Sequence, residues 1–299
     1  MAEVFAYGEV GIDNIIRVPH LPTLELAAFP TSDTYHIGGA AANTAVTLAA
    51  WGVRVRLAGN AIGDDERGRS LRQWLSAHPA LDLSDLEIRS GLATPFCRIL
   101  VLPDGERAIL VFGYPQTPKT SLTSAMLDGA RFLALDLYGG AEHAEAARTA
   151  RAVGVKTVVG DVIWPDHSVL PLADIATNSA AFIRQEFPGA DPLAHALELH
   201  RISGGIVVTT DGSNPVHVVD RDGAQFWLQP PRVEVVDATG AGDAFKAGLI
   251  YGLLQGWELR QAARWAVAAG ALKVGRLGAS SQPPGVEEVT AMSERVRDG

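Results

Sequence analysis

Apolar and polar positions along the chain follow two periods that alternate with each other. Short apolar runs typical of buried strands cover residues 4–10, 53–58, 132–137, 157–161 and 205–210. Runs with helical spacing cover residues 44–51, 71–77, 122–130, 142–153, 188–200 and 259–273. Strands that alternate with helices at this spacing predict a mostly parallel sheet covered by helices on both faces.

Two regions depart from this alternation. Residues 96–102 and 107–112 alternate in hydrophobicity, and the turn residues Pro103-Asp104-Gly105-Glu106 separate them, which predicts a β-hairpin. Residues 15–35 contain several prolines and polar breaks, and we expect extended segments there instead of a helix.

The stretch Asp-Ala-Thr-Gly-Ala-Gly-Asp-Ala-Phe-Lys-Ala-Gly at residues 237–248 predicts a turn from a strand at 232–236 into an apolar helix at 244–254. Gly240, Ala241 and Gly242 have almost no side chain, so their backbone N–H groups at a helix start can bind an anion such as phosphate. Asp243 follows in the first turn, where a carboxylate beside a phosphate is suited to remove a proton from an attacking hydroxyl.

The residues of this stretch argue against two other phosphate-binding motifs. A dinucleotide fingerprint requires glycine where Phe245 stands, and the Gly-Lys-Ser/Thr of a Walker A loop occurs nowhere in the chain. A purely structural interpretation has the glycines make a tight turn while Asp243 complements the helix dipole.

A second glycine-rich stretch, Gly38-Gly39-Ala40-Ala41-Ala42-Asn43, precedes the predicted helix at 44–51. Paired glycines allow the backbone to approach a ligand, and the Asn43 amide offers the donor and acceptor that sugar hydroxyls require. Asp13 follows the strand at 4–10, at the edge where ligands of parallel sheets bind.

These two stretches, about 200 residues apart, resemble in letters and in order the two motifs of the ribokinase family of carbohydrate kinases. The resemblance runs from about residue 4 to residue 289 and implies a ribokinase-like three-layer α/β sandwich, formed by residues 1–299 as one domain. A small β lid would come from segments of about 14–34 and 93–113. The implied activity is ATP-dependent phosphorylation of a hydroxyl on a sugar or sugar-like molecule, with a ketose or pentose favoured.

The resemblance also assigns roles to individual residues. Asp243 would act as the base, with Gly240, Ala241 and Gly242 as the anion-binding amides, and Asp13, Gly39 and Asn43 would hold the substrate. Asp136 and Asp161 each close a predicted strand, at the edge of the sheet where ligands bind. We expect Asp136 to contact substrate and Asp161 to help hold metal or phosphate.

On the nucleotide side, Thr210 and Gly212 match the family's Thr-x-Gly turn, although Pro215 replaces a second glycine. Ser179 matches the family's Asn or Ser, but Phe182 stands where a glutamate usually organises Mg²⁺. Metal handling would then fall to the nucleotide, Asp161 or Glu186. The loop 276–281, together with the carbonyl region near Asp237, is a candidate site for a monovalent cation such as K⁺.

Composition narrows the partners and the compartment. A net charge of −9 disfavours nucleic acid and anionic membranes, and no apolar run reaches the length of a membrane span. Cys97 is the single cysteine, which excludes an internal disulfide framework and fits a reducing cytoplasm. A lid sheet with free edges favours pairing of two subunits into a homodimer.

Two alternatives to a sugar kinase stay open at this point. One is a nucleoside kinase on the same scaffold, because a ribose held by Asp13 and Asn43 leaves room for a base. The other is a non-catalytic sugar or nucleotide sensor, which the missing glutamate near Ser179 supports and the intact Asp243 opposes. Residues 107–110 and 136–138 resemble ketose kinases, which favours fructose as the substrate.

Overall fold

The side chains of β1 (Val4–Gly8) point alternately into two apolar layers, as a period of two requires. Val4 and Ala6 join one buried cluster, while Phe5 and Tyr7 join the other. The computed structural model, which describes residues 1–299, repeats this pattern across a ten-stranded sheet. The core therefore lies on both faces of one sheet, as the alternation of apolar runs predicts.

The ten strands follow the order β16-β15-β14-β13-β12-β11-β10-β1-β4-β6. Besides β1 they are β4 (Val55–Gly59), β6 (Leu81–Asp82), β10 (Phe132–Leu135), β11 (Lys156–Gly160), β12 (Ile175–Ser179), β13 (Ile206–Asp211), β14 (Asn214–Val219), β15 (Gln225–Gln229) and β16 (Arg297–Asp298). All pairs from β6 to β13 are parallel, and β14 to β16 extend one edge in antiparallel fashion.

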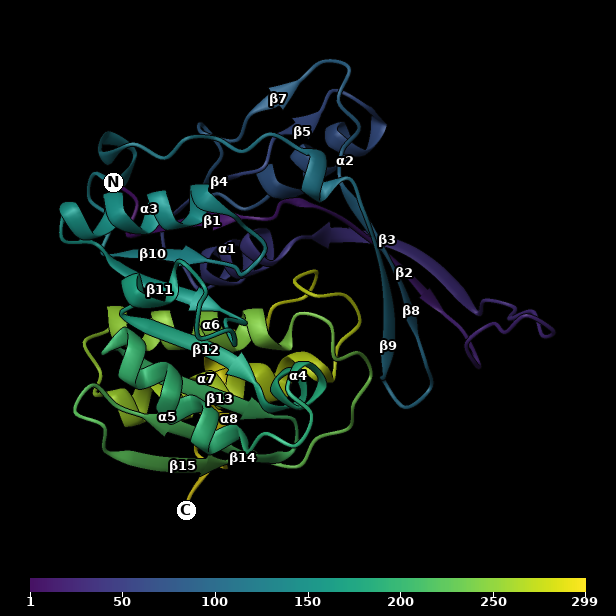
Figure 1. Cartoon of the computed structure of the whole chain (residues 1–299). Coiled ribbons are helices and arrows are strands. Elements are labelled where there is room, and N and C mark those ends of the chain that lie inside the picture. The colour runs from purple at the N-terminus through teal and green to yellow at the C-terminus, as the bar shows by residue number, and fades with distance from the viewer.

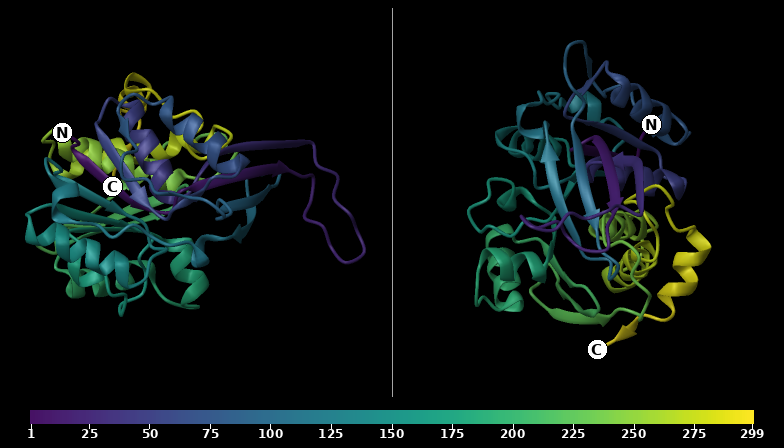
Figure 2. Two further views of the ribbon diagram at one scale, coloured as in Figure 1. Left: turned by 90° about the horizontal axis from the view of Figure 1, so that it is seen from above. Right: turned by 90° about the vertical axis from the view of Figure 1, so that its right-hand side faces the viewer.

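Helices cover the two faces of this sheet in separate layers (Figure 1 and Figure 2, left). One layer contains α1 (Ala40–Ala50), α2 (Glu66–Ser76), α6 (Ala241–Leu254), α7 (Leu259–Val274) and α8 (Val286–Ser293). The other contains α3 (Ala141–Ala152), α4 (Ala180–Glu186) and α5 (Pro192–Ser203). No helix of the structure has both the length and the apolar character that crossing a bilayer requires.

A separate four-stranded sheet, called here the small sheet, projects from the body on the right of Figure 1. Its order is β3 (Ser32–Gly38), β2 (Gly11–Arg17), β8 (Phe96–Val101) and β9 (Arg107–Phe112). The hairpin predicted at 96–112 is thus confirmed, and residues 15–35 are extended or irregular as expected. A minor two-stranded pair joins β5 (Ile62–Gly63) and β7 (Ile88–Arg89).

Two predicted elements are wrong, each for a local reason. Residues 122–130 form only the 3₁₀ turn Ser124–Leu127, because the chain leaves helical geometry at Asp128 and Gly129 has a φ of 79°. Residues 232–236 form no strand, because no neighbouring strand offers them partners; Val236 and Asp237 instead donate to the carbonyl of Val274. The helices α1 and α6 also begin earlier than predicted, at Ala40 and Ala241.

Helices α1, α6 and α7 pack together through aromatic rings. The ring of Trp265 stacks on Tyr251, with centroids 4.5 Å apart, and meets Trp51 edge to face at 4.8 Å. Only 2% of Trp265 is exposed, and its indole N–H donates to the Thr290 hydroxyl at 3.2 Å. This cluster fixes the two helices whose N-termini face the sheet edge described below.

Replacing Trp265 with alanine should lower the free energy of unfolding by about 3–5 kcal/mol, because a large buried side chain is removed and a cavity remains. Urea unfolding followed by circular dichroism measures this change. Trp227→Ala is the matched control, because that ring is 46% exposed on β15, and we expect a loss of about 1 kcal/mol or less there. Equal losses in the two variants would contradict the assignment of this cluster to the core.

Candidate active site

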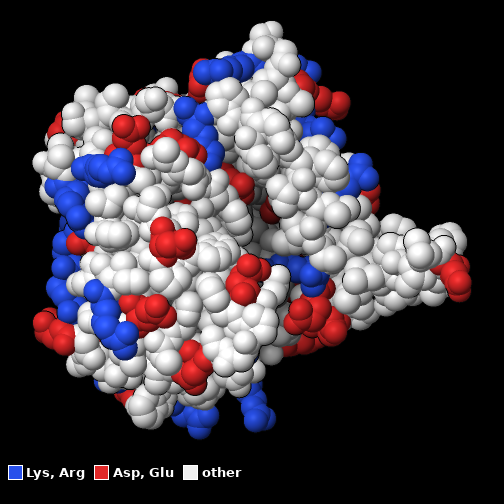
Figure 3. All heavy atoms as spheres, in the orientation of Figure 1, with Lys and Arg blue, Asp and Glu red and all other residues white.

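The carboxyl ends of β1, β10 and β11 and the N-termini of α1 and α6 meet at one edge of the large sheet, where parallel sheets bind ligands. The small sheet stands beside this edge. Figure 3 shows a cleft between the two, with acidic atoms visible inside it.

The N-terminus of α6 is open to a ligand. Gly240 precedes the helix with a φ of 76°, and a Cβ there would lie 2.6 Å from the Cβ of Ala279, so only glycine fits. A Cβ on Gly242 would meet nothing within 4 Å. The Ala241 N–H donates to the Ala238 carbonyl at 3.3 Å, whereas those of Gly240, Gly242 and Asp243 have no partner in the protein. These three N–H groups form a site for an anion.

The two glycine-rich stretches of the sequence meet at Asp243. Nδ2 of Asn43, at the start of α1, donates to Oδ2 of Asp243 at 3.1 Å, and Oδ1 of Asn43 accepts from the Ser280 hydroxyl at 2.9 Å. The Lys246 ammonium lies 3.9 Å from the other Asp243 oxygen and donates to the Leu135 carbonyl at 3.1 Å. The carboxylate is therefore held from two sides by a donor and a cation.

Burial raises the pKa of Asp243 to about 7, with Asp161 and Asp136 adding repulsion while Lys246 and the Asn43 hydrogen bond oppose it. Its side chain keeps 13% exposure toward the cleft. A carboxylate with a pKa near neutrality can accept a proton from a hydroxyl and release it again. The position thus suits a general base.

Asp13 lies on β2 at the base of the cleft and is 4% exposed. Burial and the carboxylates of Asp243 and Asp237 raise its pKa to about 7. No protein group donates a hydrogen bond to its carboxylate, while Gly38 leaves space for it: a Cβ on Gly38 would lie 2.3 Å from Oδ1. A buried carboxylate without a protein partner calls for a donor from elsewhere, which a sugar hydroxyl provides.

Gly39 brings the backbone before α1 close to the end of β1. Its φ is 91°, and a Cβ would lie 2.3 Å from the Glu9 carbonyl oxygen. A side chain at this position would therefore push the start of α1, and Asn43 with it, away from the cleft.

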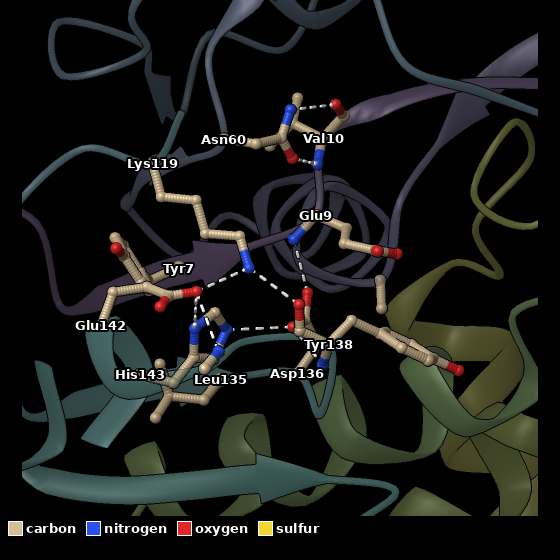
Figure 4. Close-up of polar contacts among 12 residues, drawn as sticks. Tyr7, Glu9, Val10, Asn60, Lys119, Leu135, Asp136, Tyr138, Glu142 and His143 are labelled. Carbon is tan, nitrogen blue, oxygen red and sulfur yellow. Dashed lines mark hydrogen bonds and ion pairs between the residues drawn. The ribbon is translucent and has the colours of Figure 1, made fainter. Parts of the chain in front are cut away.

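Asp136 is embedded in a polar network instead of pointing freely into the cleft (Figure 4). Its Oδ1 accepts from the Tyr138 N–H and meets Nε2 of His143, each at 3.1 Å, while Oδ2 accepts from the Glu9 N–H at 2.5 Å. Although burial opposes it, the hydrogen bonds and the charge of His143 hold its pKa below the usual value. With both oxygens engaged and 1% exposure, Asp136 ties the ends of β1 and β10 together.

Three residues near the cleft are absent from the sequence-based set. Burial and the repulsion of Asp136 raise the pKa of Glu9 to about 8, and the pKa of Tyr138 is raised by burial and by Asp161. Lys246 is the third. Glu9 and Tyr138 follow strand ends, and Lys246 stands one helical turn after Asp243, which are the only sequence signals that mark them.

The residues predicted for the nucleotide lie along β12 and β13. The Thr210 hydroxyl donates to the Asn178 carbonyl at 3.1 Å, and Gly212 has a φ of 57° with open space around its Cβ position. Ser179 ends β12 and directly precedes α4, and the Phe182 ring packs edge to face against the Trp164 ring with the ring centroids 5.3 Å apart. An apolar contact therefore stands where the family's glutamate is expected.

Asp161 follows β11 and is the only non-glycine residue with a positive φ, 60°. A positive φ is uncommon outside glycine, although aspartate adopts it more readily than most residues. Burial raises the pKa of Asp161, and Lys246 opposes that effect. No cluster of three or more His, Cys, Asp or Glu residues suited to a metal exists in the structure. A single carboxylate such as that of Asp161 does not make a metal site, so Asp161 would hold a metal only together with ligands from a bound nucleotide.

The family follows from a comparison with known proteins. A sequence model described as pfkB family carbohydrate kinase matches residues 1–285. The chain belongs to this family. It is a sugar kinase, a phosphotransferase with an alcohol group as acceptor, and the ribokinase-like fold expected from the sequence is confirmed.

Relatives span the whole chain. An ATP-dependent ribose-1-phosphate kinase of Halopiger xanaduensis is 30% identical over 312 residues, covering 99% of each chain. A ribokinase of Haemophilus influenzae is 27% identical over 304 residues, covering 97% of each. Because enzymes of this family transfer phosphate, a sensor without activity is no longer an alternative.

Solved structures share the fold. The ribokinase of Arabidopsis thaliana complexed with ribose and ATP has a TM-score of 0.81 at 18% identity, covering 98% of this chain and 99% of that one. A structure from E. coli in complex with ATP and Mg²⁺ has a TM-score of 0.80 at 20% identity, covering 99% of this chain and 100% of that one. Homologous kinases therefore bind ATP with Mg²⁺.

The raised pKa values near 7 predict an acid limb in the pH profile. Protonated Asp243 cannot accept a proton, so kcat/KM should fall by about tenfold or more per pH unit below about 7 and level off between about pH 7 and 8. Initial rates of ADP release from pH 5 to 8 measure this. Asp13→Asn removes one of the other groups that titrate in this range and should make the acid limb less steep. A flat profile in the wild type over this range would contradict Asp243 as the base.

Proposed function

We propose that this kinase uses ATP to phosphorylate a hydroxyl of a neutral ketose or pentose. The observation that carries the proposal is the pairing of Asp13, whose buried carboxylate has no protein partner, with Asp243 at the open N-terminus of α6. Carboxylates accept hydrogen bonds from hydroxyls, so this cleft is suited to a polyol. The acidic side chains Glu9, Asp13 and Asp243 disfavour an acceptor that carries a phosphate of its own.

In the mechanism we propose, Asp13, Gly39 and Asn43 hold the acceptor with one hydroxyl next to Asp243. Asp243 removes the proton from that hydroxyl as the oxygen attacks the terminal phosphoryl group. The N–H groups of Gly240, Gly242 and Asp243 stabilise the charge on the transferred group. Ala241 contributes through its small size, because its own N–H already bonds to Ala238.

The nucleotide would lie along β12 and β13, next to Thr210, Gly212 and Ser179. Bound Mg²⁺ would neutralise charge on the phosphates, and Asp161 is the protein carboxylate that we propose helps to hold the ion. We assign Asp136 a positioning function, because its oxygens hold the backbone at Glu9 and Tyr138. We further propose that residues 1–299 form a single domain in which the small sheet closes over the substrate as a lid. We also propose that the protein is located in the cytoplasm.

Asp243→Asn should lower kcat by about 10²- to 10⁴-fold with little change in KM, because the amide keeps the shape but cannot take the proton. A coupled ADP-release assay measures both constants. Asp222→Asn, an exposed carboxylate in the turn before β15, is the matched control and should retain wild-type rates. Turnover of Asp243→Asn near the wild-type rate would remove Asp243 from the mechanism.

The acceptor class is tested in the same assay with fructose, ribose, ribose 1-phosphate and nucleosides. The proposal expects the highest kcat/KM with a neutral ketose or pentose. Preference for a nucleoside would establish the nucleoside kinase alternative. Preference for ribose 1-phosphate would show that the acidic cleft accepts an anion and would contradict the substrate class proposed here.

We also propose that two copies of the chain pair through the small sheet. Its edge strand β9 has no partner on its outer side, and its apolar side chains Ile109, Leu110, Val111 and Phe112 are 41–56% exposed. An unpaired apolar edge strand favours association with another strand. A second copy of this sheet supplies such a surface.

Leu110→Lys together with Val111→Lys should convert the dimer to a monomer, because two charges would then face each other across the contact. Light scattering after size-exclusion chromatography measures the mass. Ile202→Lys, on an exposed position of α5, is the matched control and should leave the mass unchanged. A wild-type protein that is monomeric at assay concentrations would refute this pairing.

A further inference from the structure

Lys273, in the last turn of α7, holds its ammonium group inside a ring of oxygen atoms. Its Nζ donates to the Asp237 carbonyl at 2.7 Å and to the Arg276 carbonyl at 3.1 Å. It also lies 3.9 Å from Oδ2 of Asp237. Only 2% of the residue is exposed, so water does not solvate this charge and the three oxygens must do so.

Asp237 is itself fully buried and held in place. Its Oδ1 accepts from the Thr239 N–H at 2.8 Å, and its Oδ2 accepts from the Gly278 N–H at 2.9 Å. A carboxylate and two backbone carbonyls are hard oxygen donors of the kind that bind alkali cations. These atoms belong to the turn and the loop that the sequence marks as a candidate monovalent-cation site.

A monovalent cation does not fit this site as the structure has it. The Lys273 ammonium already uses both carbonyl oxygens, and a second cation among the same atoms would be repelled by it at short range. The chain therefore supplies from its own side chain the positive charge that the donor set requires.

The oxygen ring is continuous with the groups around Asp243. Asp237 begins the turn that ends in the free N–H groups of Gly240 and Gly242. Arg276 begins the loop that carries Ser280, whose hydroxyl holds Asn43, which in turn holds Asp243. By joining the turn to the loop, the ammonium fixes the anion site and the base relative to each other.

We propose that Lys273 is a tethered cation that takes the place of a bound monovalent ion, so that this kinase folds and turns over without K⁺. The proposal rests on the proposed function only in taking the turn at residues 237–243 as the phosphoryl site. Lys273 is in this sense a positioning residue, because it acts on the reaction through the backbone of that turn.

The wild-type protein tests the first half of the proposal. When K⁺ replaces tetramethylammonium at equal ionic strength, its rate of ADP release should change by less than about twofold and its Tm should stay the same. Activation by K⁺ of about tenfold or more, with a rise in Tm, would show a separate ion site and overturn the proposal.

Two variants of Lys273 test the second half. Lys273→Ala removes the charge and leaves room for an ion, so Tm should drop by roughly 5–10 °C in tetramethylammonium and recover in K⁺ or NH₄⁺. Lys273→Met removes the charge but fills the space, so neither ion should restore it. Leu272→Ala, the neighbouring residue on α7, should lose stability without any ion-specific recovery.

Recovery of Lys273→Ala by K⁺ but not by tetramethylammonium, with none in Lys273→Met, would support the proposal. Equal melting of all three variants in every salt would reduce Lys273 to a packing role and overturn it. Because Tm needs no substrate, this result stands even if none of the tested sugars is phosphorylated. If Lys273→Ala is insoluble without K⁺, expression and refolding with and without K⁺ give the same comparison.

The pH profile adds a readout that packing alone would not change. Burial lowers the pKa of Lys273 to about 8; Arg107 adds to this shift, while Asp237 and Asp243 oppose it, and His36 also faces the ammonium. Activity of the wild type should therefore fall above about pH 8 as the ammonium loses its proton. Lys273→Ala in K⁺ should keep its activity there, because K⁺ has no proton to lose.

Discussion

The hydrogen bond between Asn43 and Asp243 is the contact on which the organisation of this kinase depends. It joins the first turns of α1 and α6, which are 200 residues apart in sequence, at the edge of one sheet. The helices can meet there because glycines at 39 and 240 allow the backbone to approach where a side chain would collide with the Glu9 carbonyl or with Ala279. Asn43, Asp243 and the free N–H groups at the start of α6 therefore lie next to one another in one connected unit.

Electrostatics in the cleft depend on burial more than on any single pair. Several carboxylates converge there, and desolvation raises the pKa values of Glu9, Asp13 and Asp243 toward neutrality. The buried ammonium of Lys246 lies 3.9 Å from Asp243 and opposes the rise in the pKa of that carboxylate. An enzyme that must take a proton near neutral pH benefits from this balance, because a fully ionised carboxylate with an ordinary pKa is a weaker base.

The two buried lysines show how the same side chain serves different ends. Lys246 lies beside Asp243, whereas Lys273 joins the Asp237 turn to the loop behind it. Each ammonium lies 3.9 Å from an aspartate oxygen and also donates to one or two backbone carbonyls, which offsets the cost of burying the charge. The turn at residues 237–243 is in this way held by two buried, charged side chains of the chain itself.

The sequence by itself determined the parallel sheet, the helices on both faces, the hairpin at 96–112 and the family, because apolar periodicity and glycine-rich turns are local properties. It also marked Asp243, Asn43 and Asp13 as candidates, but not that Asn43 holds Asp243, nor that Asp136 is saturated by Glu9, Tyr138 and His143. Residues 232–236 form no strand, although their pattern predicts one, because a strand needs backbone hydrogen bonds to a neighbouring strand and none lies beside them. Only the tertiary structure decided that the Lys273 ammonium reaches the Asp237 carbonyl. The end of a long side chain lies far from its own backbone, and the periodicity of the sequence does not show which atoms it will contact.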